Sequence, residues 1–211
     1  MTRYLTEFIG TFFLVLTICL SAGTGSQYAP LAISSSLMVM VYMGGPISGA
    51  HYNPAVSIAA LLVRKLPGRE LVPYLLAQFA GAIAAAAIGG WVLGAPFAPA
   101  PTPNASGMKA LAIEALYSFA LCLVVLNVAM SKRSAGNPYF GLAIGFTIAA
   151  AAFAGGGISG GAFNPAVGVG TILVSTVAGG GSFAHAWLYI VGPLLGAVAA
   201  SQVFAMQESS A

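Results

Sequence analysis

The decapeptide Ile47-Ser-Gly-Ala-His-Tyr-Asn-Pro-Ala-Val56 recurs 111 residues later as Ile158-Ser-Gly-Gly-Ala-Phe-Asn-Pro-Ala-Val167. Seven of the ten positions carry the same residue in both copies. Asn is a favoured helix N-cap and Pro is a favoured first helical residue. Each copy therefore predicts the start of a short helix, over about residues 53–63 in the first case and about 164–175 in the second.

The duplication extends beyond this decapeptide. Two similar segments each begin an apolar run: Glu7-Phe-Ile-Gly-Thr-Phe-Phe-Leu and Glu114-Ala-Leu-Tyr-Ser-Phe-Ala-Leu. The segment that starts at Tyr74 is likewise repeated in the segment that starts at Tyr189. The offsets of 107, 111 and 115 residues keep the matched segments in order, which indicates an internal repeat. We expect a single domain with repeat 1 over about 1–93, a linker over about 94–107 and repeat 2 over about 108–206. The linker is expected to be exposed because it holds four prolines: Pro96, Pro99, Pro101 and Pro103.

The composition excludes most classes of soluble protein. Only 5% of the 211 residues are charged, 59% are hydrophobic and the mean hydropathy is +0.94, whereas soluble domains carry about 25% charge. No Asp, Glu, Lys or Arg lies between Glu7 and Arg64, an interval far longer than the ~20 residues that span a bilayer. A net charge of +3 from scattered cations also gives no surface for nucleic acid. The chain is therefore expected to be an all-α protein embedded in the lipid bilayer.

The apolar runs predict six transmembrane helices and two re-entrant half-helices. Continuous runs rich in Leu, Ala, Ile and Gly, without alternation of apolar and polar residues, favour helices over a barrel. A cleaved signal peptide over Met1–Ser21 is the alternative for the first run, although Glu7 interrupts it. Three spans per repeat make the second repeat inverted, with the functional site at the interface between halves. The expected spans are 4–22, 30–45, 71–93, 109–130, 138–155 and 183–206.

The positive residues predict the orientation. With a cytoplasmic N-terminus, six of the seven Lys and Arg residues fall on the cytoplasmic side and only Lys109 falls outside, as the positive-inside rule requires. The chain is thus expected to be a multi-pass protein of the cell membrane with both termini in the cytoplasm. The residues expected inside are Arg3, Arg64, Lys65, Arg69, Lys132 and Arg133.

The two Asn-Pro-Ala segments predict the centre of a pore. Ten helical residues measure roughly 15 Å, half of a hydrocarbon core of ~30 Å, so two helices entering from opposite faces meet at the midplane. Irregular backbone is tolerated there only if it is buried or lines water. The predicted midplane residues are Asn53, Pro54, Ala55, Asn164, Pro165 and Ala166. The glycines expected to form an extended approach with carbonyls facing the channel are Gly44, Gly45, Gly49, Gly155, Gly156, Gly157, Gly160 and Gly161.

Such a pore favours neutral solutes. Carbonyl acceptors and the Asn53 and Asn164 amide donors suit a neutral molecule that forms hydrogen bonds. Each helix N-terminus carries about half a positive charge, and removing water from an ion costs tens of kcal/mol in a low-dielectric site. The pore is therefore expected to exclude ions, protons included.

These features resemble the aquaporin or major intrinsic protein family, and in particular a bacterial-type member. The resemblance covers nearly the whole chain: the segments at Glu7 and Glu114, both Asn-Pro-Ala motifs, Gln78-Phe-Ala-Gly81 and Gly192-Pro-Leu-Leu-Gly196. It implies six spans with two half-helices, one pore in each subunit and a homotetramer. It also implies that the two glutamates support the re-entrant backbone by accepting its N–H groups.

The chain departs from the family pattern at the filter. Most members have an Arg directly after the second Asn-Pro-Ala, whereas this chain has Val167. The spacing from each Asn puts the other three filter positions at Ile33, Ala152 and Gly161. Loss of the Arg removes five donors and a fixed positive charge. We expect passage of water and small neutral solutes such as hydrogen peroxide, ammonia, urea, polyols and metalloid hydroxides, and the alternative is a water-selective channel whose neighbouring side chains fill the filter.

Alternative roles remain open for the polar residues, and an alternative function remains open for the whole chain. Glu7 and Glu114 are read as supports of the re-entrant loops or as a proton relay. His51 is expected at the cytoplasmic vestibule, as a residue that lines the pore or as a pH sensor. An ion-coupled secondary transporter would also use inverted repeats and broken helices. Two histidines and four glutamates without a nucleophile make no catalytic set, so we expect no enzyme activity, no cofactor and no metal site.

Overall fold

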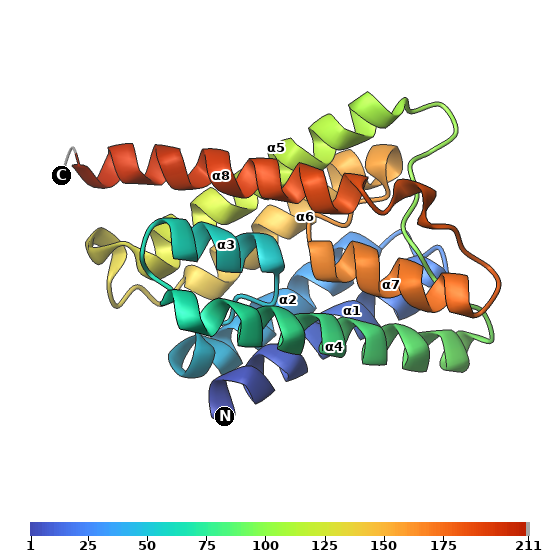
Figure 1. The fold of residues 1–211 in the computed structure, drawn as a ribbon, viewed down its shortest axis with the longest axis horizontal. Helices are drawn as coiled ribbons and strands as arrows, with labels where there is room; N and C mark the ends of the chain where they lie inside the picture. Colours follow the sequence, from blue (N-terminus) through green and yellow to red (C-terminus); the bar gives the residue numbers. More distant parts are fainter. Residues whose placement is uncertain (210–211) are drawn as a thin grey trace.

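Six long and two short α-helices make up the fold over residues 1–209, which are the residues that the computed structural model describes (Figure 1). The long helices are α1 (Thr2–Gly23), α2 (Ala29–Ser48), α4 (Gly68–Leu93), α5 (Gly107–Val125), α6 (Phe140–Ser159) and α8 (Leu188–Ser209). The short ones are α3 (Pro54–Leu62) and α7 (Pro165–Val177). A π-helical turn, η1 (Leu126–Met130), continues α5, and the 3-10 turns η2 (Lys132–Ser134) and η3 (Phe183–His185) lie in connections.

The prediction of six membrane-spanning helices is confirmed. All six long segments are apolar enough to cross a bilayer and contain 20 to 27 residues, or at least about 30 Å of helix at 1.5 Å per residue. Several of the expected boundaries agree to within two or three residues. The second short helix has 13 residues, somewhat more than expected.

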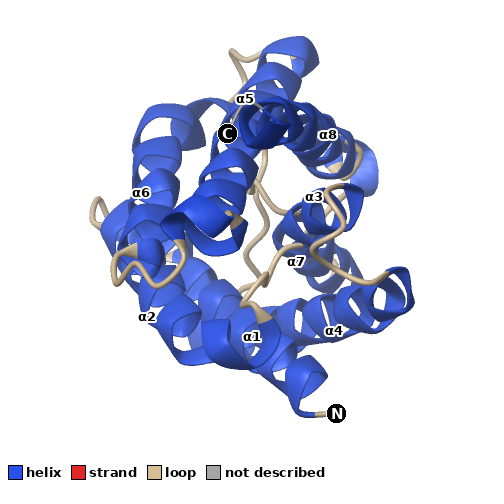
Figure 2. Cartoon of the chain, turned by 90° about the vertical axis from the view of Figure 1, so that its left-hand side faces the viewer, coloured by secondary structure: helices blue, strands red, loops and turns tan. Residues whose placement is uncertain are grey.

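The long helices enclose the short ones. Within the first half α1 packs against α2 and α4, within the second half α5 packs against α6 and α8, and α2 and α6 join the halves. The end-on view in Figure 2 shows the long helices around the irregular segments that precede α3 and α7. In Figure 1 these two short helices point toward each other from opposite sides of the molecule.

Glycine brings the helix pairs into backbone contact. A Cβ atom on Gly81 of α4 would lie 2.5 Å from the carbonyl oxygen of Phe8, and one on Gly196 of α8 would lie 2.5 Å from the carbonyl oxygen of Ala115 and the nitrogen of Phe119. The obstacles are backbone atoms, which cannot move away as a flexible side chain does. Small residues at these positions therefore set the distance between paired helices.

Replacing Gly196 by valine should separate α5 from α8 and lower the melting temperature. A branched side chain cannot fit against the Ala115 carbonyl, and overpacking of this kind costs about 1–3 kcal/mol or more. Thermal unfolding of the detergent-solubilised protein measures the effect. Gly156→Val in α6 is the matched control, because no atom lies within 4 Å of a Cβ added there, and equal losses in the two variants would argue against close packing at Gly196.

The expectation of an extended glycine approach is wrong for five glycines. Helix α2 continues to Ser48 and α6 continues to Ser159, so the glycines before these ends are helical. Within the helices, Gly44 and Gly155 leave room for close packing, because a Cβ there would meet Tyr52 and Ile113, respectively. The irregular approach begins later, at Gly49 and Gly160, with φ of +88° and +91°. The five helical glycines are Gly44, Gly45, Gly155, Gly156 and Gly157.

The proline-rich linker is only partly exposed, contrary to expectation. Pro99 is buried, and the N–H of Thr102 donates to the carbonyl of Ile158 at 3.1 Å. A Cβ on Gly160 would lie 2.7 Å from the nitrogen of Ala100. The linker therefore packs on the end of α6, because the glycine leaves room for its backbone.

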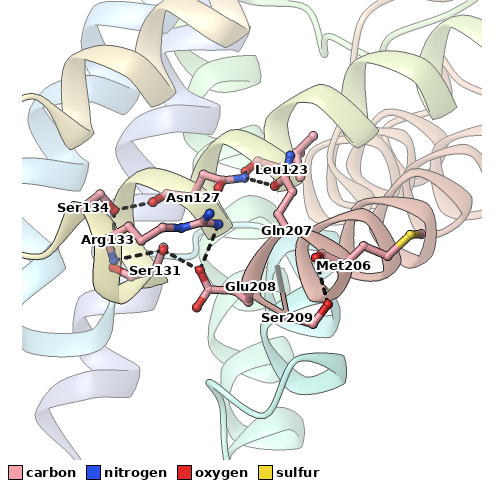
Figure 3. A network of polar contacts seen from close by, with 9 residues as sticks. All are labelled: Leu123, Asn127, Ser131, Arg133, Ser134, Met206, Gln207, Glu208 and Ser209. Carbon is pink, nitrogen blue, oxygen red and sulfur yellow. Dashed lines mark hydrogen bonds and ion pairs between the residues drawn. The ribbon is translucent and has the colours of Figure 1, made fainter. Parts of the chain in front are cut away.

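The end of α8 is attached to the connection between α5 and α6, as Figure 3 shows. Glu208 accepts a hydrogen bond from Ser131 at 2.7 Å and pairs with Arg133 at 3.1 Å. Gln207 accepts a bond from Asn127 at 2.9 Å. These contacts fix the π-helical turn η1 against α8 at the end of the molecule where α2 also ends.

Candidate functional site: a pore at the junction of the two short helices

The two Asn side chains of the repeated motif cross-link the halves of the chain. Asn53 Nδ2 donates to the carbonyl of Phe163 at 2.9 Å, and Asn164 Nδ2 donates to the carbonyl of Tyr52 at 2.8 Å. Each amide therefore bonds to the residue that immediately precedes the other Asn. The beginnings of α3 and α7 meet as the duplicated sequence predicts.

The same Asn residues cap their own helices. Asn53 Oδ1 accepts from the N–H of Ala55 at 2.9 Å, and Asn164 Oδ1 accepts from the N–H of Ala166 at 2.9 Å. Each cap residue is extended, with φ of −156° and −160°, and proline follows as the first helical residue. The cap fixes the oxygen of each amide, so the NH₂ group faces the other half of the chain. One N–H of this group forms the cross-link, and the second N–H is available as a donor.

Glu7 of α1 holds the irregular segment before α3. Its carboxylate accepts the N–H of His51 at 3.0 Å, the N–H of Tyr52 at 2.8 Å, the hydroxyl of Ser48 at 2.6 Å and the amide of Gln78 at 2.8 Å. The side chain is fully buried. Four donors saturate the four lone-pair sites of an ionised carboxylate, which explains how a charge is tolerated at this depth.

Glu114 of α5 holds the second segment in the same way with one donor fewer. Its carboxylate accepts the N–H of Ala162 at 3.0 Å, the N–H of Phe163 at 2.6 Å and the hydroxyl of Ser159 at 2.7 Å. Tyr189 completes the arrangement by donating to the carbonyl of Ser159 at 2.6 Å.

These contacts maintain an unfavourable backbone conformation. Ala50, Tyr52 and Phe163 have φ of 50°, 51° and 49°, in the left-handed region that residues with a Cβ rarely adopt. Each such residue costs roughly 1–3 kcal/mol and persists only where neighbouring contacts fix it. The carboxylates of Glu7 and Glu114 supply those contacts, so that the carbonyls of Tyr52 and Phe163 point toward the opposite Asn.

A narrow cavity passes alongside this junction. Its volume is about 40 Å³, enough for about three water molecules. Its lining includes the polar residues Asn53, Asn164 and His51, and aliphatic side chains of the long helices make up much of the rest. The aliphatic residues are Leu14, Ile18, Ile33, Leu37, Val41, Leu121, Val125, Ile144 and Ile148.

The four residues expected at the filter all line this cavity. Ile33 comes from α2, Ala152 from α6, Gly161 from the segment before α7, and Val167 from the first turn of α7. Val167 is 2% exposed. None of the four side chains carries a charge or a hydrogen-bond donor.

His51 lines the same cavity near its other end. It is buried, its Nδ1 lies 3.0 Å from the hydroxyl of Ser57, and its ring lies 5.2 Å from that of Tyr74. No local sequence pattern connects His51 with Ser57 and Gln78, because the three residues come from different elements. The sequence feature that points to this cluster is the difference between the repeats: the matching positions of the second repeat have no polar side chains.

Comparisons with known proteins agree with this geometry. Residues 1–204 match the model of the family described as "Major intrinsic protein". The chain is 36% identical to "Putative aquaporin NIP4-1" of Arabidopsis thaliana, over 96% of this chain and 73% of that protein. It is also 36% identical to "Glycerol uptake facilitator protein-like 6" of Lactiplantibacillus plantarum, over 95% of each chain.

A solved structure has the same fold. The aquaglyceroporin from Plasmodium falciparum matches with a TM-score of 0.81 and 24% identity, over 95% of both chains. Six apolar spans, two half-helices joined through their Asn residues, and a family match over almost the full length lead to one conclusion. The chain belongs to the major intrinsic protein family of membrane channels.

Proposed function

We propose that this protein is a passive channel through which water and small neutral solutes cross the membrane, with Asn53 and Asn164 at the centre of the path. The observation that carries the proposal is the pair of Asn amides, each fixed by its own helix and by the opposite half, beside a narrow cavity. A solute oxygen that reaches the junction meets N–H donors on one side and aliphatic groups on the other. Only a molecule that needs few hydrogen bonds passes such a half-apolar path.

Ions and protons are excluded by the same arrangement. Two helix N-termini direct their partial positive charge to one point, and within residues 1–209 no acidic side chain lines the cavity. A cation that lost its water here would regain too little to offset the cost of desolvation. Glu7 and Glu114 support the loops and take no part in ion coupling, because backbone and side-chain donors already occupy their carboxylates.

The outer constriction is permissive and accepts solutes larger than water. Ile33, Ala152, Gly161 and Val167 form it, in a bacterial-type channel that lacks the arginine of most relatives. Absence of charge and of bulk at this ring favours small polyols, urea, hydrogen peroxide, ammonia and metalloid hydroxides over strict selection for water.

Reconstituted vesicles test both parts of the proposal. The purified protein in proteoliposomes should speed osmotic water flow, and it should also speed glycerol and urea entry, measured by stopped-flow light scattering against protein-free vesicles. Conduction of water alone would favour the water-selective alternative. Flux that saturates or needs an ion gradient would favour a transporter.

The functional unit is proposed to be a homotetramer in the cell membrane with both termini in the cytoplasm. The family relationship supports the tetramer, and the positive residues support the orientation. Repeats 1–93 and 108–206, joined by the linker 94–107, form the inverted halves of each pore. Cross-linking in native membranes and the accessibility of cysteines introduced near Arg69 and Lys109 test these statements.

A further inference from the structure

The two halves of the pore differ in one respect. The first half contains a chain of bonded polar side chains, Gln78, Ser57 and His51, which runs from the Glu7 carboxylate to the cavity. The second half has no such chain, because the matched positions hold residues without polar side chains: Pro193, Gly168 and Ala162. At these three matched positions, side chains that form hydrogen bonds are therefore present only in the first half.

The direction of the first bonds follows from the carboxylate. Glu7 accepts three other donors, so Gln78 presents its NH₂ group to Glu7, at 2.8 Å. The second hydrogen of this NH₂ group points to the hydroxyl oxygen of Ser57 at 2.9 Å. The Ser57 oxygen is therefore an acceptor from Gln78, and its own hydrogen is free to be donated.

The Ser57 hydroxyl oxygen lies 3.0 Å from His51 Nδ1. With the Ser57 hydrogen donated to Nδ1, the neutral imidazole carries its proton on Nε2. Within residues 1–209 no protein atom forms a hydrogen bond with Nε2. A Cβ on Gly49 would lie 3.3 Å from Nε2, so the glycine leaves this edge of the ring uncovered.

His51 lies at the passage between two cavities. It is the one residue, over the described part of the chain, that lines both the pore cavity and the hollow of about 420 Å³ bordered by Arg3 and Lys65. Contact with the Tyr74 ring and the bond to Ser57 hold the imidazole at this place. The imidazole therefore lies where the pore cavity and that hollow border each other.

We propose that Gln78 and Ser57 are positioning residues that present the His51 Nε2–H group to passing solutes, and that discrimination among neutral solutes occurs at His51. The proposal rests on the channel function proposed above. The outer ring of Ile33, Ala152, Gly161 and Val167 has no donor side chain and little bulk, so it sorts solutes weakly. His51 combines a rigid ring with a fixed donor, and it favours slender solutes with an acceptor oxygen.

The tautomer is tested by ¹⁵N NMR of histidine-labelled protein in bilayers at mildly alkaline pH, where imidazole is neutral. The second histidine, His185, is exposed and is removed by His185→Asn so that only His51 is observed. The protein should show an unprotonated Nδ1 and a protonated Nε2. Ser57→Ala and Gln78→Met should each populate the other tautomer, because Nδ1 loses its oriented donor.

Ser118→Ala is the matched control. Ser118 is a fully buried serine whose hydroxyl has no partner and lies outside the cavity lining, so its loss should leave the His51 spectrum unchanged. A protonated Nδ1 in the parent protein would overturn the proposal, as would an unchanged spectrum in both Ser57→Ala and Gln78→Met.

Transport measurements test the consequence for selectivity. In proteoliposomes, His51→Ala should raise the ratio of erythritol to water permeability by about tenfold, and Ser57→Ala should raise it by about fivefold, the factor that corresponds to one hydrogen bond. Ser118→Ala should leave the ratio unchanged. If the parent channel conducts water and glycerol but His51→Ala leaves the ratio as it was, the inference about His51 fails while the channel function stands, and if the parent protein conducts neither solute, the proposed function itself fails.

Discussion

Replacing Val167 by arginine should reduce glycerol and urea permeability by about tenfold or more, with a smaller effect on water. Val167 is 2% exposed and lines a cavity of only about 40 Å³. Its backbone lies in the first turn of α7, where the helix disfavours a cation close to its axis. The guanidinium group must therefore extend into the cavity, where it blocks the wider solutes first.

Stopped-flow measurements on proteoliposomes with equal protein content detect this change. Val177→Arg is the matched control, since Val177 lies at the end of the same helix and is 81% exposed. Its permeabilities should equal those of the parent channel. Unaltered glycerol flux in Val167→Arg would show that the side chain at 167 does not border the path.

Replacing Glu7 by glutamine should cost most of the stability of the fold. The glutamine NH₂ group would replace one carboxylate oxygen and face the two donors bound there. These are either the N–H of His51 and the hydroxyl of Ser48, or the N–H of Tyr52 and the amide of Gln78. Each buried donor left without an acceptor costs about 1–3 kcal/mol, and two or more such losses approach the 5–15 kcal/mol that holds a typical domain together. We expect little folded protein and no detectable water permeability.

Size-exclusion chromatography and thermal unfolding in detergent measure the loss. Glu70→Gln is the control: Glu70 lies in the first turn of α4 and, within residues 1–209, contacts Tyr4 and Arg69, so its change should have little effect. Glu114→Gln should be less damaging than Glu7→Gln, because Glu114 accepts three hydrogen bonds where Glu7 accepts four. A Glu7→Gln protein as stable as the parent would contradict the supporting role of this carboxylate.

The regular part of the fold could be predicted from the sequence because each signal was local. Continuous apolar runs gave the six spans, and Asn53-Pro54 and Asn164-Pro165 marked the starts of both short helices. The duplication predicted that the first residues of the two short helices meet, because an odd number of spans per repeat inverts the second copy. The positions expected for the filter came from the resemblance to the family, carried onto this chain by the spacing from each Asn.

Features that depend on contacts between distant residues could not be predicted. The glycines at 44 and 155 suggested irregular backbone, but both lie within helices, where they leave room for Tyr52 and Ile113. The linker prolines suggested exposure, yet Ala100 and Thr102 pack on the end of α6. Nothing local marks such packing, because its cause is a partner far along the chain.

The bonded chain from Gln78 to His51 was missed for a related reason. Gln78 and Ser57 are 21 residues apart and lie on different helices, and each reads by itself as an ordinary polar packing residue. Comparison of the two repeats position by position would have revealed it, because polar residues stand in the first copy where the second has proline, glycine and alanine.

The reciprocal bonds between Asn53 and Phe163 and between Asn164 and Tyr52 bear on biosynthesis. Asn53 emerges from the ribosome 110 residues before the carbonyl that it bonds, an interval of roughly 5–20 s at the usual rates of translation. During that time the nascent first half holds an unsatisfied amide and an unsatisfied Tyr52 carbonyl. The insertion machinery or trapped water must shelter these groups until the second half arrives, so the halves become native together and not in succession.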